Sequence, residues 1–221
     1  MTKLKLKARV GARVPTRHGQ FQLILYENNQ DSKQHLAFVL GDVHGAEDLL
    51  LRVHSECFTS DVLGSLRCDC GEQLERSLEM IGRAGRGALL YLRQEGRGIG
   101  LVDKLRAYNL QDSGFDTVEA NLQLGHDVDE RDYTPAALMI RDLGIRSINL
   151  ITNNPTKIRE LRRLGIDICR RTAVEIAPGP ENLRYLRTKR FRMDHLLRLG
   201  GSAGVGPAAL ALKSPRSTDG P

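Results

Sequence analysis

The sequence of 221 residues contains no tryptophan, and aromatic residues make up only 5% of it. Proteins that bind single-stranded nucleic acid stack bases on aromatic side chains that lie among basic ones. No such interleaving is present, because the lysines and arginines beyond residue 17 are scattered along the chain. A net charge of +6 is typical of proteins that bind nucleic acid, membrane surfaces or small polyanions. We therefore expect no nucleic-acid partner and keep a small polyanion as the candidate ligand.

Long apolar runs are also missing. No stretch approaches the roughly 18 apolar residues that a membrane-spanning helix requires. The basic N-terminus has no continuous apolar segment behind it, unlike a secretory signal. We expect a cytoplasmic protein without a membrane partner. The first 17 residues carry basic side chains and no acidic ones, which predicts a solvated end beside a first strand. These basic residues are Lys3, Lys5, Lys7, Arg9, Arg13 and Arg17.

Cysteine is scarce, and four residues are too few for a disulfide scaffold in a chain of this size. Three of them form the pattern Cys57-x10-Cys68-x-Cys70, whereas Cys169 stands alone. Thiolates are ligands that zinc prefers, and three protein ligands leave a position for water, as in catalytic zinc sites. Two alternatives stay open here: reduced cysteines without a metal, and a structural zinc with His54 as the fourth ligand.

A cluster of three thiolates raises a chemical difficulty of its own. Sulfur ligands donate much negative charge, so zinc held by them is a weaker Lewis acid than zinc held by three histidines. Such a site benefits from a nearby base or hydrogen-bonding group. His54 and Glu56 lie close enough in the sequence to serve.

Alternation of apolar segments with turn-prone ones predicts an α/β fold, with a mixed β-sheet flanked by helices. Strands are expected at residues 14–26, 35–43, 49–56, 88–93, 147–152 and 166–171. Helices are expected at residues 71–81, 101–114, 134–144 and 158–165. The close spacing of the early strands indicates antiparallel pairing in the N-terminal half. Residues 1–199 are expected to form one domain, followed by a disordered tail at 200–221 that is rich in Gly, Ala, Ser and Pro.

Three polar segments lie where such folds bind anions. QEGRGIG places three glycines around Arg97 between a strand and a helix, although it matches neither common phosphate-binding glycine motif. A helix N-terminus attracts anions, and an arginine there can bind phosphate through two hydrogen bonds. DERDYT offers Asp129 and Arg131, and TNNPTK offers Thr152 and Lys157 at a strand end. Each segment alone also fits an ordinary turn or a solvated helix cap.

Taken in order, six segments resemble the motif series of GTP cyclohydrolase II over roughly residues 10–195: RVHSEC, SLRCDCGEQL, RQEGRGIGL, DTVEANLQLG, DERDY and LITNNPTK. The resemblance implies a catalytic domain of that family at residues 1–199, with GTP as substrate. It also implies one Zn²⁺ per subunit, Mg²⁺ accompanying the triphosphate, and a homodimer. No additional synthase domain precedes the motifs, so a monofunctional protein is expected.

The implied reaction is the first step of riboflavin biosynthesis. Water activated by zinc attacks C8 of the purine, and the imidazole ring opens with release of formate. Cleavage at the α-phosphate releases pyrophosphate. The implied product is 2,5-diamino-6-ribosylamino-4(3H)-pyrimidinone 5′-phosphate.

The resemblance also assigns roles to residues. The implied metal ligands are Cys57, Cys68 and Cys70. The implied substrate contacts are Arg52, Val53, His54, Ser55, Glu56, Gln73, Glu95, Gly96, Arg97, Thr117, Thr152 and Lys157. Asp129 corresponds to a proton acceptor and Arg131 to a nucleophile at the α-phosphorus. A guanidinium is normally protonated, and an electrostatic role explains Arg131 equally well. Tyr108 is implied to carry the reaction past a formamide intermediate.

Two rival functions remain. A zinc-dependent nucleobase deaminase also uses thiolate ligands and a glutamate, and HSE resembles its H-x-E motif. The P-C-x-x-C segment of such enzymes is missing, however, and Cys68-x-Cys70 has a different gap. The second rival is a catalytically inactive GTP-binding regulator, against which the intact cysteines, Asp129 and Arg131 argue. Release of ammonia or of formate from GTP separates the deaminase from the cyclohydrolase.

Overall fold

The computed structural model describes residues 3–198, so the predicted tail at 200–221 lies outside the described residues. Its strands are β1 (Leu6–Thr16), β2 (Gly19–Asn28), β3 (His35–Leu40), β4 (Leu49–Ser55), β5 (Gly87–Leu92), β6 (Ser147–Ile151) and β7 (Asp167–Thr172). They form one sheet in the order β1-β2-β3-β5-β4-β6-β7. In this order, the neighbours β1, β2, β3 and β5 pair antiparallel. The neighbours β5, β4, β6 and β7 pair parallel. The predicted α/β fold with a mixed sheet is confirmed.

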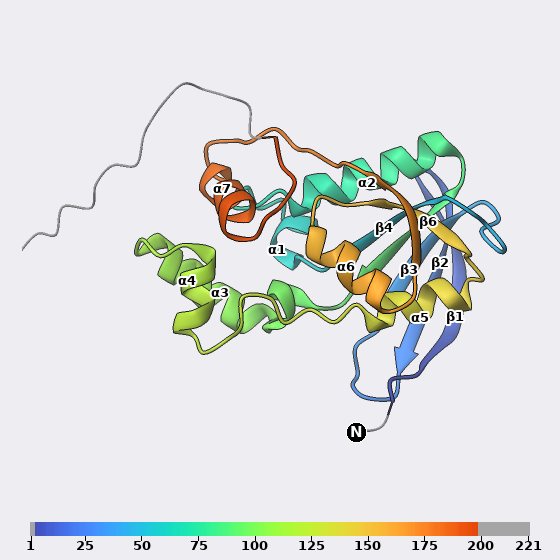
Figure 1. Ribbon diagram of the computed structural model, residues 1–221, viewed down its shortest axis with the longest axis horizontal. Helices are drawn as coiled ribbons and strands as arrows, with labels where there is room; N and C mark the ends of the chain where they lie inside the picture. The colour runs from blue at the N-terminus through green and yellow to red at the C-terminus, as the bar shows by residue number, and fades with distance from the viewer. Residues whose placement is uncertain (1–2, 199–221) are drawn as a thin grey trace, which may run out of the picture.

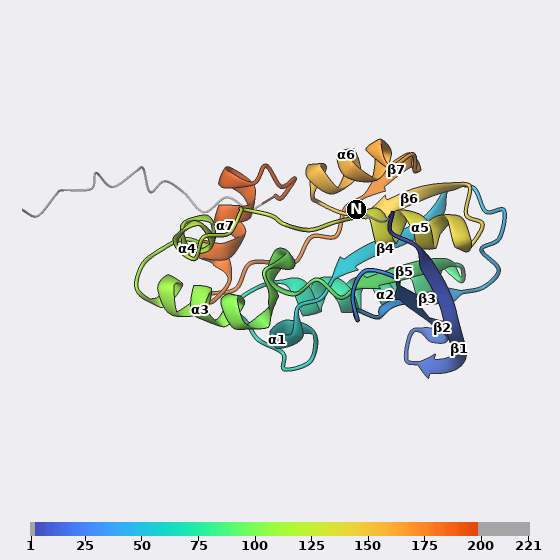
Figure 2. The same ribbon diagram turned by 90° about the horizontal axis from the view of Figure 1, so that it is seen from below.

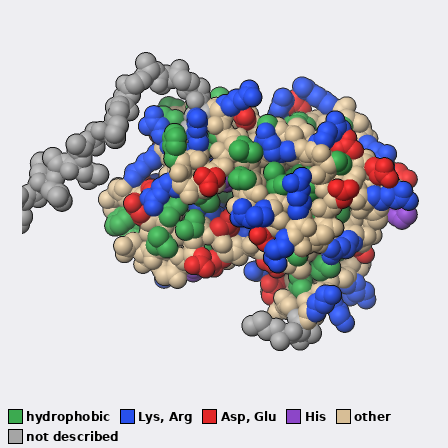
Figure 3. All heavy atoms as spheres, in the orientation of Figure 1, with side chains coloured by type: hydrophobic (Ala, Val, Ile, Leu, Met, Phe, Trp, Pro, Cys, Tyr) green, Lys and Arg blue, Asp and Glu red, His purple; other side chains and the backbone are tan. Residues whose placement is uncertain are grey.

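The helices are α1 (Phe58–Asp61), α2 (Cys70–Ala84), α3 (Gly100–Asp112), α4 (Thr117–Gln123), α5 (Thr134–Asp142), α6 (Pro155–Arg163) and α7 (Leu183–Arg192). A short 3₁₀ helix, η1 (Glu95–Gly98), precedes α3. Within residues 3–198, no helix combines the length and the apolar character needed to cross a membrane. In Figure 3, acidic side chains are interspersed among the basic ones on the face shown.

The N-terminal region forms a hairpin rather than the single strand predicted at residues 14–26. β1 and β2 are joined at Arg17 and His18, and Thr16 pairs with Gly19. Apolar and basic residues largely alternate along residues 6–14, which is the pattern of a strand. The concentration of basic residues led us to expect a solvated end there instead. β1 is an edge strand whose basic side chains are exposed. Charges at such an edge discourage pairing with another sheet.

Helices cover both faces of the sheet, and Figure 2 shows α2 on one side with α5 and α6 on the other. Along α2 the buried positions recur every four residues, at Gln73, Ser77 and Ile81, because four residues bring a side chain back to the same helix face. Ile81 packs with residues of the sheet such as Leu89. The opposite face holds the larger core. Burial of each large aliphatic side chain there contributes about 1.5–3 kcal/mol.

The parallel strands bring three connecting segments to one edge of the sheet. β4, β5 and β6 run in the same direction, so the residues that follow them meet beyond their carboxyl ends. β5 pairs antiparallel with β3 on one side and parallel with β4 on the other. The sheet therefore changes from antiparallel to parallel pairing at β5. Helices α3, α4 and α7 lie together on this side of the molecule, away from the N-terminal hairpin (Figure 1).

Three helices were not expected from the sequence. α1 is a single turn and is too short to show a period. α4 begins with a capping box between Asp116 and Glu119, a recognisable signal that marks its start. α7 has many basic residues, and its buried positions are Leu186, Thr188 and Lys189, so the sequence shows no apolar stripe there. This last helix contributes a wall of the pocket described next.

Candidate active site

A pocket lies beyond the carboxyl ends of β4, β5 and β6, with walls from α3, α4 and α7. The centre of a water molecule can occupy about 140 Å³ of it. Of the residues predicted to form the site, all except Val53 and Asp129 line it. Segments far apart in the sequence therefore converge as the motif series implied, although contact with a substrate stays a prediction for each residue.

Val53 points away from the pocket. Successive side chains of a strand face opposite sides of the sheet, so Val53 lies opposite its neighbours Arg52 and His54. Its side chain is 0% exposed and belongs to the core. The Val53 side chain therefore does not line the pocket, and a contact of this residue with substrate stays a prediction. Its backbone carbonyl instead accepts a hydrogen bond from the ammonium of Lys157.

The three clustered cysteines meet at one side of the pocket. Cys57 follows β4, Cys68 lies in the next loop and Cys70 begins α2. Their sulfur atoms all lie within 4.8 Å of one another. Cys57 Sγ and Cys68 Sγ are 3.6 Å apart. Tetrahedral zinc with Zn–S bonds of about 2.3 Å requires sulfur separations of about 3.8 Å. The donor set and its spacing fit a zinc ion.

The protonation of the cysteines agrees with that fit. Hydrogen bonds from Cys68 and Cys70, with Lys104 adding to them, hold the pKa of Cys57 far below its usual range. The same contacts raise the pKa of Cys68 and Cys70, because the three sulfurs then share the remaining protons. Among the three thiols, Cys57 is thus the one that loses its proton most readily. A divalent ion bound at these sulfurs would take the place of the shared protons.

His54 is not a fourth ligand in this geometry. Among the described residues, the cluster able to hold a metal consists of the three cysteines alone. His54 Nε2 lies 3.0 Å from Asp61 Oδ2, and the same oxygen accepts hydrogen bonds from the Cys57 backbone N–H and the Tyr91 hydroxyl, each over 2.9 Å. His54 thus supports the backbone of Cys57 through Asp61. The alternative of a structural zinc completed by this histidine is not supported.

The loop after β5 approaches the cysteine cluster from the other side. Gly96 and Arg97 both have positive φ values, 62° and 64°. A non-glycine residue in this region is strained by about 1–3 kcal/mol, a cost usually found at functional sites. The Glu95 carboxylate accepts hydrogen bonds from the backbone N–H groups of Phe58, over 2.6 Å, and Gly96, over 2.8 Å. Glu95 therefore ties this loop to the segment that carries Cys57.

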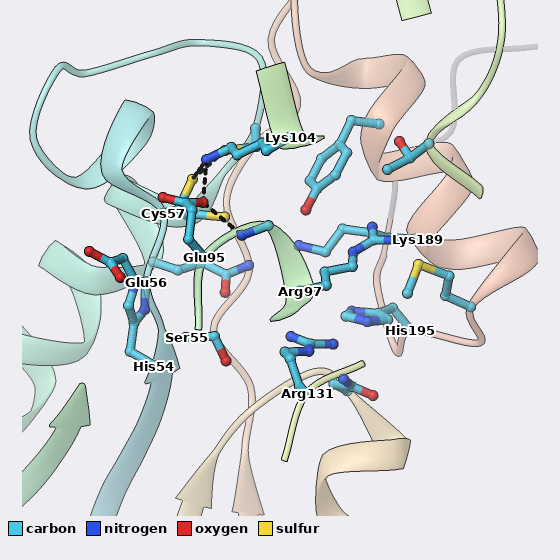
Figure 4. Close-up of a pocket in the computed structure, with 18 of the residues that line it drawn as sticks. His54, Ser55, Glu56, Cys57, Glu95, Arg97, Lys104, Arg131, Lys189 and His195 are labelled. Carbon is cyan, nitrogen blue, oxygen red and sulfur yellow. Dashed lines mark hydrogen bonds and ion pairs between the residues drawn. The ribbon is translucent and has the colours of Figure 1, made fainter. Parts of the chain in front are cut away.

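Basic side chains gather at the opposite side of the pocket. Figure 4 shows Arg97, Arg131 and Lys189 there, with the ring of His195 beside them, across from Cys57 and Glu95. The cations are crowded: burial, then the nearby Arg52 and Arg131, lower the pKa of Lys157 well below its usual value. One guanidinium nitrogen of Arg97, Nη2, is buried without a partner among the described residues. Such a group of cations fits a polyanion.

Arg131 and Asp129 form a close, two-pronged ion pair. Arg131 Nε donates to Asp129 Oδ1 over 2.7 Å, and Arg131 Nη2 donates to Asp129 Oδ2 over 2.5 Å. Burial alone would raise the pKa of Asp129, yet these hydrogen bonds lower it. Burial alone would lower the pKa of Arg131, but Tyr133 and Asp129 outweigh burial and raise it. Both groups therefore keep their charges, which makes Asp129 a weak base toward Arg131.

Helix α7 and the residues after it supply pocket residues that sequence reasoning missed. Tyr185, Lys189, Met193 and His195 all line the pocket. Lys189 Nζ lies 2.7 Å from Asp69 Oδ1, and both side chains are nearly fully buried. Because Asp69 stands between Cys68 and Cys70, this ion pair fixes α7 against the segment that carries these two cysteines. Burial and the surrounding cations, Lys189 first, lower the pKa of His195 to about 2, so its ring is neutral.

Comparison with known proteins shows the family of the chain. The family profile described as GTP cyclohydrolase II matches residues 7–173. The chain belongs to the GTP cyclohydrolase II family. Helix α7 lies beyond the region that the profile matches, although it lines the same pocket. The family predicted from the motif series is confirmed.

Relatives of the chain carry the name riboflavin biosynthesis protein RibBA. The protein from Salinispora tropica is 56% identical over 187 residues, which cover 84% of this chain and 47% of that protein. The protein from Chlorobium phaeovibrioides is 51% identical over 205 residues, which cover 92% of this chain and 50% of that protein. The chain thus spans about half the length of the curated relatives it matches.

Proposed function

We propose that this chain hydrolyses GTP, opening the imidazole ring with release of formate and pyrophosphate. The proposed product is 2,5-diamino-6-ribosylamino-4(3H)-pyrimidinone 5′-phosphate, the first intermediate of riboflavin biosynthesis. One observation carries the proposal: a cluster of three thiols and a cluster of cations face each other across one pocket (Figure 4). A nucleotide has the same polarity, with a base at one end and phosphates at the other.

The residues at the thiol side prepare the site for the purine. Cys57, Cys68 and Cys70 would hold zinc, which supplies a Lewis acid and a water nucleophile near neutral pH when bound. Gln73 projects from the first turn of α2, and its Oε1 accepts a hydrogen bond from Arg52 Nη2 over 2.7 Å. Gln73 Nε2 in turn donates to Asp69 Oδ2 over 2.5 Å, so these contacts hold both side chains in place where they line the pocket. We propose that they read the polar edge of guanine.

The residues at the cation side hold the phosphate chain. We propose that Arg97, Arg131 and Lys157 bind its oxygens, with Mg²⁺ entering on the triphosphate. Asn154 caps α6 and accepts hydrogen bonds from the backbone N–H groups of Thr156 and Lys157, which sets the direction of Lys157. The charge that Arg131 retains beside Asp129 favours electrostatic stabilisation of the departing pyrophosphate over covalent attack by Arg131.

Product analysis after incubation with GTP and Mg²⁺ tests the function. Formate and pyrophosphate are expected in equal amounts, together with a pyrimidine product. Ammonia in place of formate would instead identify a deaminase. Tight GTP binding without either product, in a sample that contains zinc, would identify an inactive regulator.

Tyr108 provides a test of how far the reaction proceeds. Its hydroxyl lies 3.2 Å from Thr59 Oγ1, which in turn lies 3.8 Å from Cys57 Sγ, so it reaches the thiol cluster through one side chain. Burial raises the pKa of Tyr108, so it acts as a neutral hydrogen-bond donor. Tyr108→Phe is expected to slow the second hydrolysis and let the formamide accumulate.

Chromatographic analysis of the products checks this, with Tyr26→Phe as the matched control. Tyr26 is buried, and its hydroxyl donates to Asp142 outside the pocket, so its variant should give the wild-type product ratio. A Tyr108→Phe product ratio equal to that of wild type would show that the hydroxyl plays no part in this step.

We also propose a cytoplasmic homodimer. A reducing compartment keeps the three thiols free to bind metal. The family resemblance implies the dimer, and apolar side chains of α1 and α3 are exposed, among them Phe58 and Val102. Light scattering on the purified chain measures the oligomeric state directly, and a monomer at micromolar concentration would refute the dimer.

A further inference from the structure

Lys104 extends from α3 to a position between the cysteine cluster and the loop after β5 (Figure 4). Its ammonium nitrogen donates to Cys57 Sγ over 3.1 Å and to Glu95 Oε1 over 2.7 Å. The side chains of Lys104 and Glu95 are each only 9% exposed. Removing two charges from water costs several kcal/mol each, and their mutual attraction repays this only with good geometry. The Lys104 ammonium here has two hydrogen-bond partners, the sulfur of Cys57 and the carboxylate of Glu95.

The sulfur contact answers the chemical difficulty of a site built from thiolates alone. Three thiolates outweigh the two positive charges of zinc by one negative charge. The Lys104 ammonium places a positive charge directly against one of these sulfurs, while Glu95 shares the same ammonium. A hydrogen bond to a ligating sulfur also withdraws electron density from it, which is a common means of adjusting a metal centre. His54 and Glu56, the nearby groups expected to help, are engaged elsewhere, with Asp61 and Arg93 respectively.

We propose that Lys104 is a positioning residue that adjusts the metal centre through its hydrogen bond to Cys57 and, through Glu95, fixes the following loop against that centre. The inference rests on the zinc site of the proposed function. Glu95 accepts from Lys104, Phe58 and Gly96 at once, so a single carboxylate connects α3, α1 and the start of η1. Removing the ammonium alters both the sulfur and this connection.

Cobalt(II) substituted for zinc provides a readout that does not depend on turnover, because thiolate-to-cobalt charge transfer absorbs light. The variant Lys104→Met keeps the length of the side chain but removes the donor and the charge. Its charge-transfer band is expected at longer wavelength than in wild type, since a thiolate with one hydrogen bond fewer gives up an electron more easily. Lys104→Arg, which retains a charged donor, should move the band back toward the wild-type position.

Turnover and a neighbouring variant complete the experiment. For the zinc-loaded Lys104→Met variant, kcat for formate release should fall by about 10- to 100-fold, the usual effect of losing a hydrogen-bond partner of a metal ligand. The KM for GTP should change less than kcat. Arg106→Met is the matched control, because Arg106 lies on the same helix and pairs with Asp103 at the surface. Its cobalt spectrum and turnover should equal those of wild type.

The possible outcomes separate this inference from the function on which it rests. A wild-type protein that binds neither zinc nor cobalt refutes the proposed metal site itself. If wild type binds cobalt and Lys104→Met gives the same band, the role of Lys104 is refuted while the metal site stands. Should Lys104→Met fail to fold because Glu95 is left unpaired, Lys104→Met combined with Glu95→Gln removes both charges. The double variant should show the same band shift, and an unshifted band would again overturn the inference.

Discussion

Replacing Cys68 by serine is expected to empty the metal site and to abolish formate release. Cys68 is buried, and its sulfur lies 3.6 Å from that of Cys57, so a serine hydroxyl would sit where zinc prefers a thiolate. Loss of a residue that merely supports a metal ligand already costs about 10- to 100-fold in metal affinity or activity. Loss of a ligand should cost more. Metal analysis of the purified variant and a formate assay measure the two effects.

Cys169→Ser is the control for this substitution. Cys169 is exposed on β7, and its sulfur contacts Asp48 rather than the cluster. The same chemical change there should leave zinc content and turnover at wild-type values. Full zinc occupancy with normal turnover in Cys68→Ser would remove Cys68 from the ligand set and with it the catalytic-zinc interpretation.

Arg131→Ala is expected to reduce pyrophosphate release by about 100- to 1000-fold, the usual effect of removing a group that stabilises developing negative charge. The substitution removes one cation of the phosphate side. It also leaves Asp129, whose pKa is lowered chiefly by hydrogen bonds from Arg131, as an unpaired negative charge near the phosphates. A pyrophosphate assay under saturating GTP measures the loss. Arg163→Ala, which removes an arginine paired with Glu160 at the surface, should behave as wild type.

Arg131→Lys distinguishes the two roles considered for this residue. Lysine keeps the positive charge but cannot form the paired hydrogen bonds of a guanidinium. An electrostatic role predicts partial pyrophosphate release by this variant. A covalent role predicts none, together with a phosphorylated arginine that rapid quenching of the wild-type reaction would trap. Unchanged pyrophosphate release in Arg131→Ala would eliminate both roles.

The sequence contained enough information to place most of the pocket. Cys57, Cys68 and Cys70 are close in sequence and chemically distinctive, so their meeting could be expected. The segments that follow β5 and β6 could be expected to meet them, because parallel strands end at one edge of a sheet. The motif was taken as a block, whereas the period of two along a strand turns the side chain of Val53 into the core.

Other parts of the site could not be predicted because they depend on packing between distant segments. Lys104 reads as an ordinary polar residue of α3 until the fold brings it to within 3.1 Å of Cys57 Sγ. The basic character of α7 suggests a solvated helix, yet Lys189 is buried against Asp69, 120 residues earlier in the chain. His195 lines the pocket only because α7 is held there. Such contacts leave no periodic signal in the sequence.

Ring opening is proposed to depend on an ion held by the three thiols. The most direct test removes metal from the wild-type protein with a chelator and returns zinc in measured steps, while formate released from GTP is followed. Formate release is expected to be absent without metal and to rise in proportion to zinc, up to one ion per chain. Undiminished formate release from protein shown to be metal-free would contradict the claim.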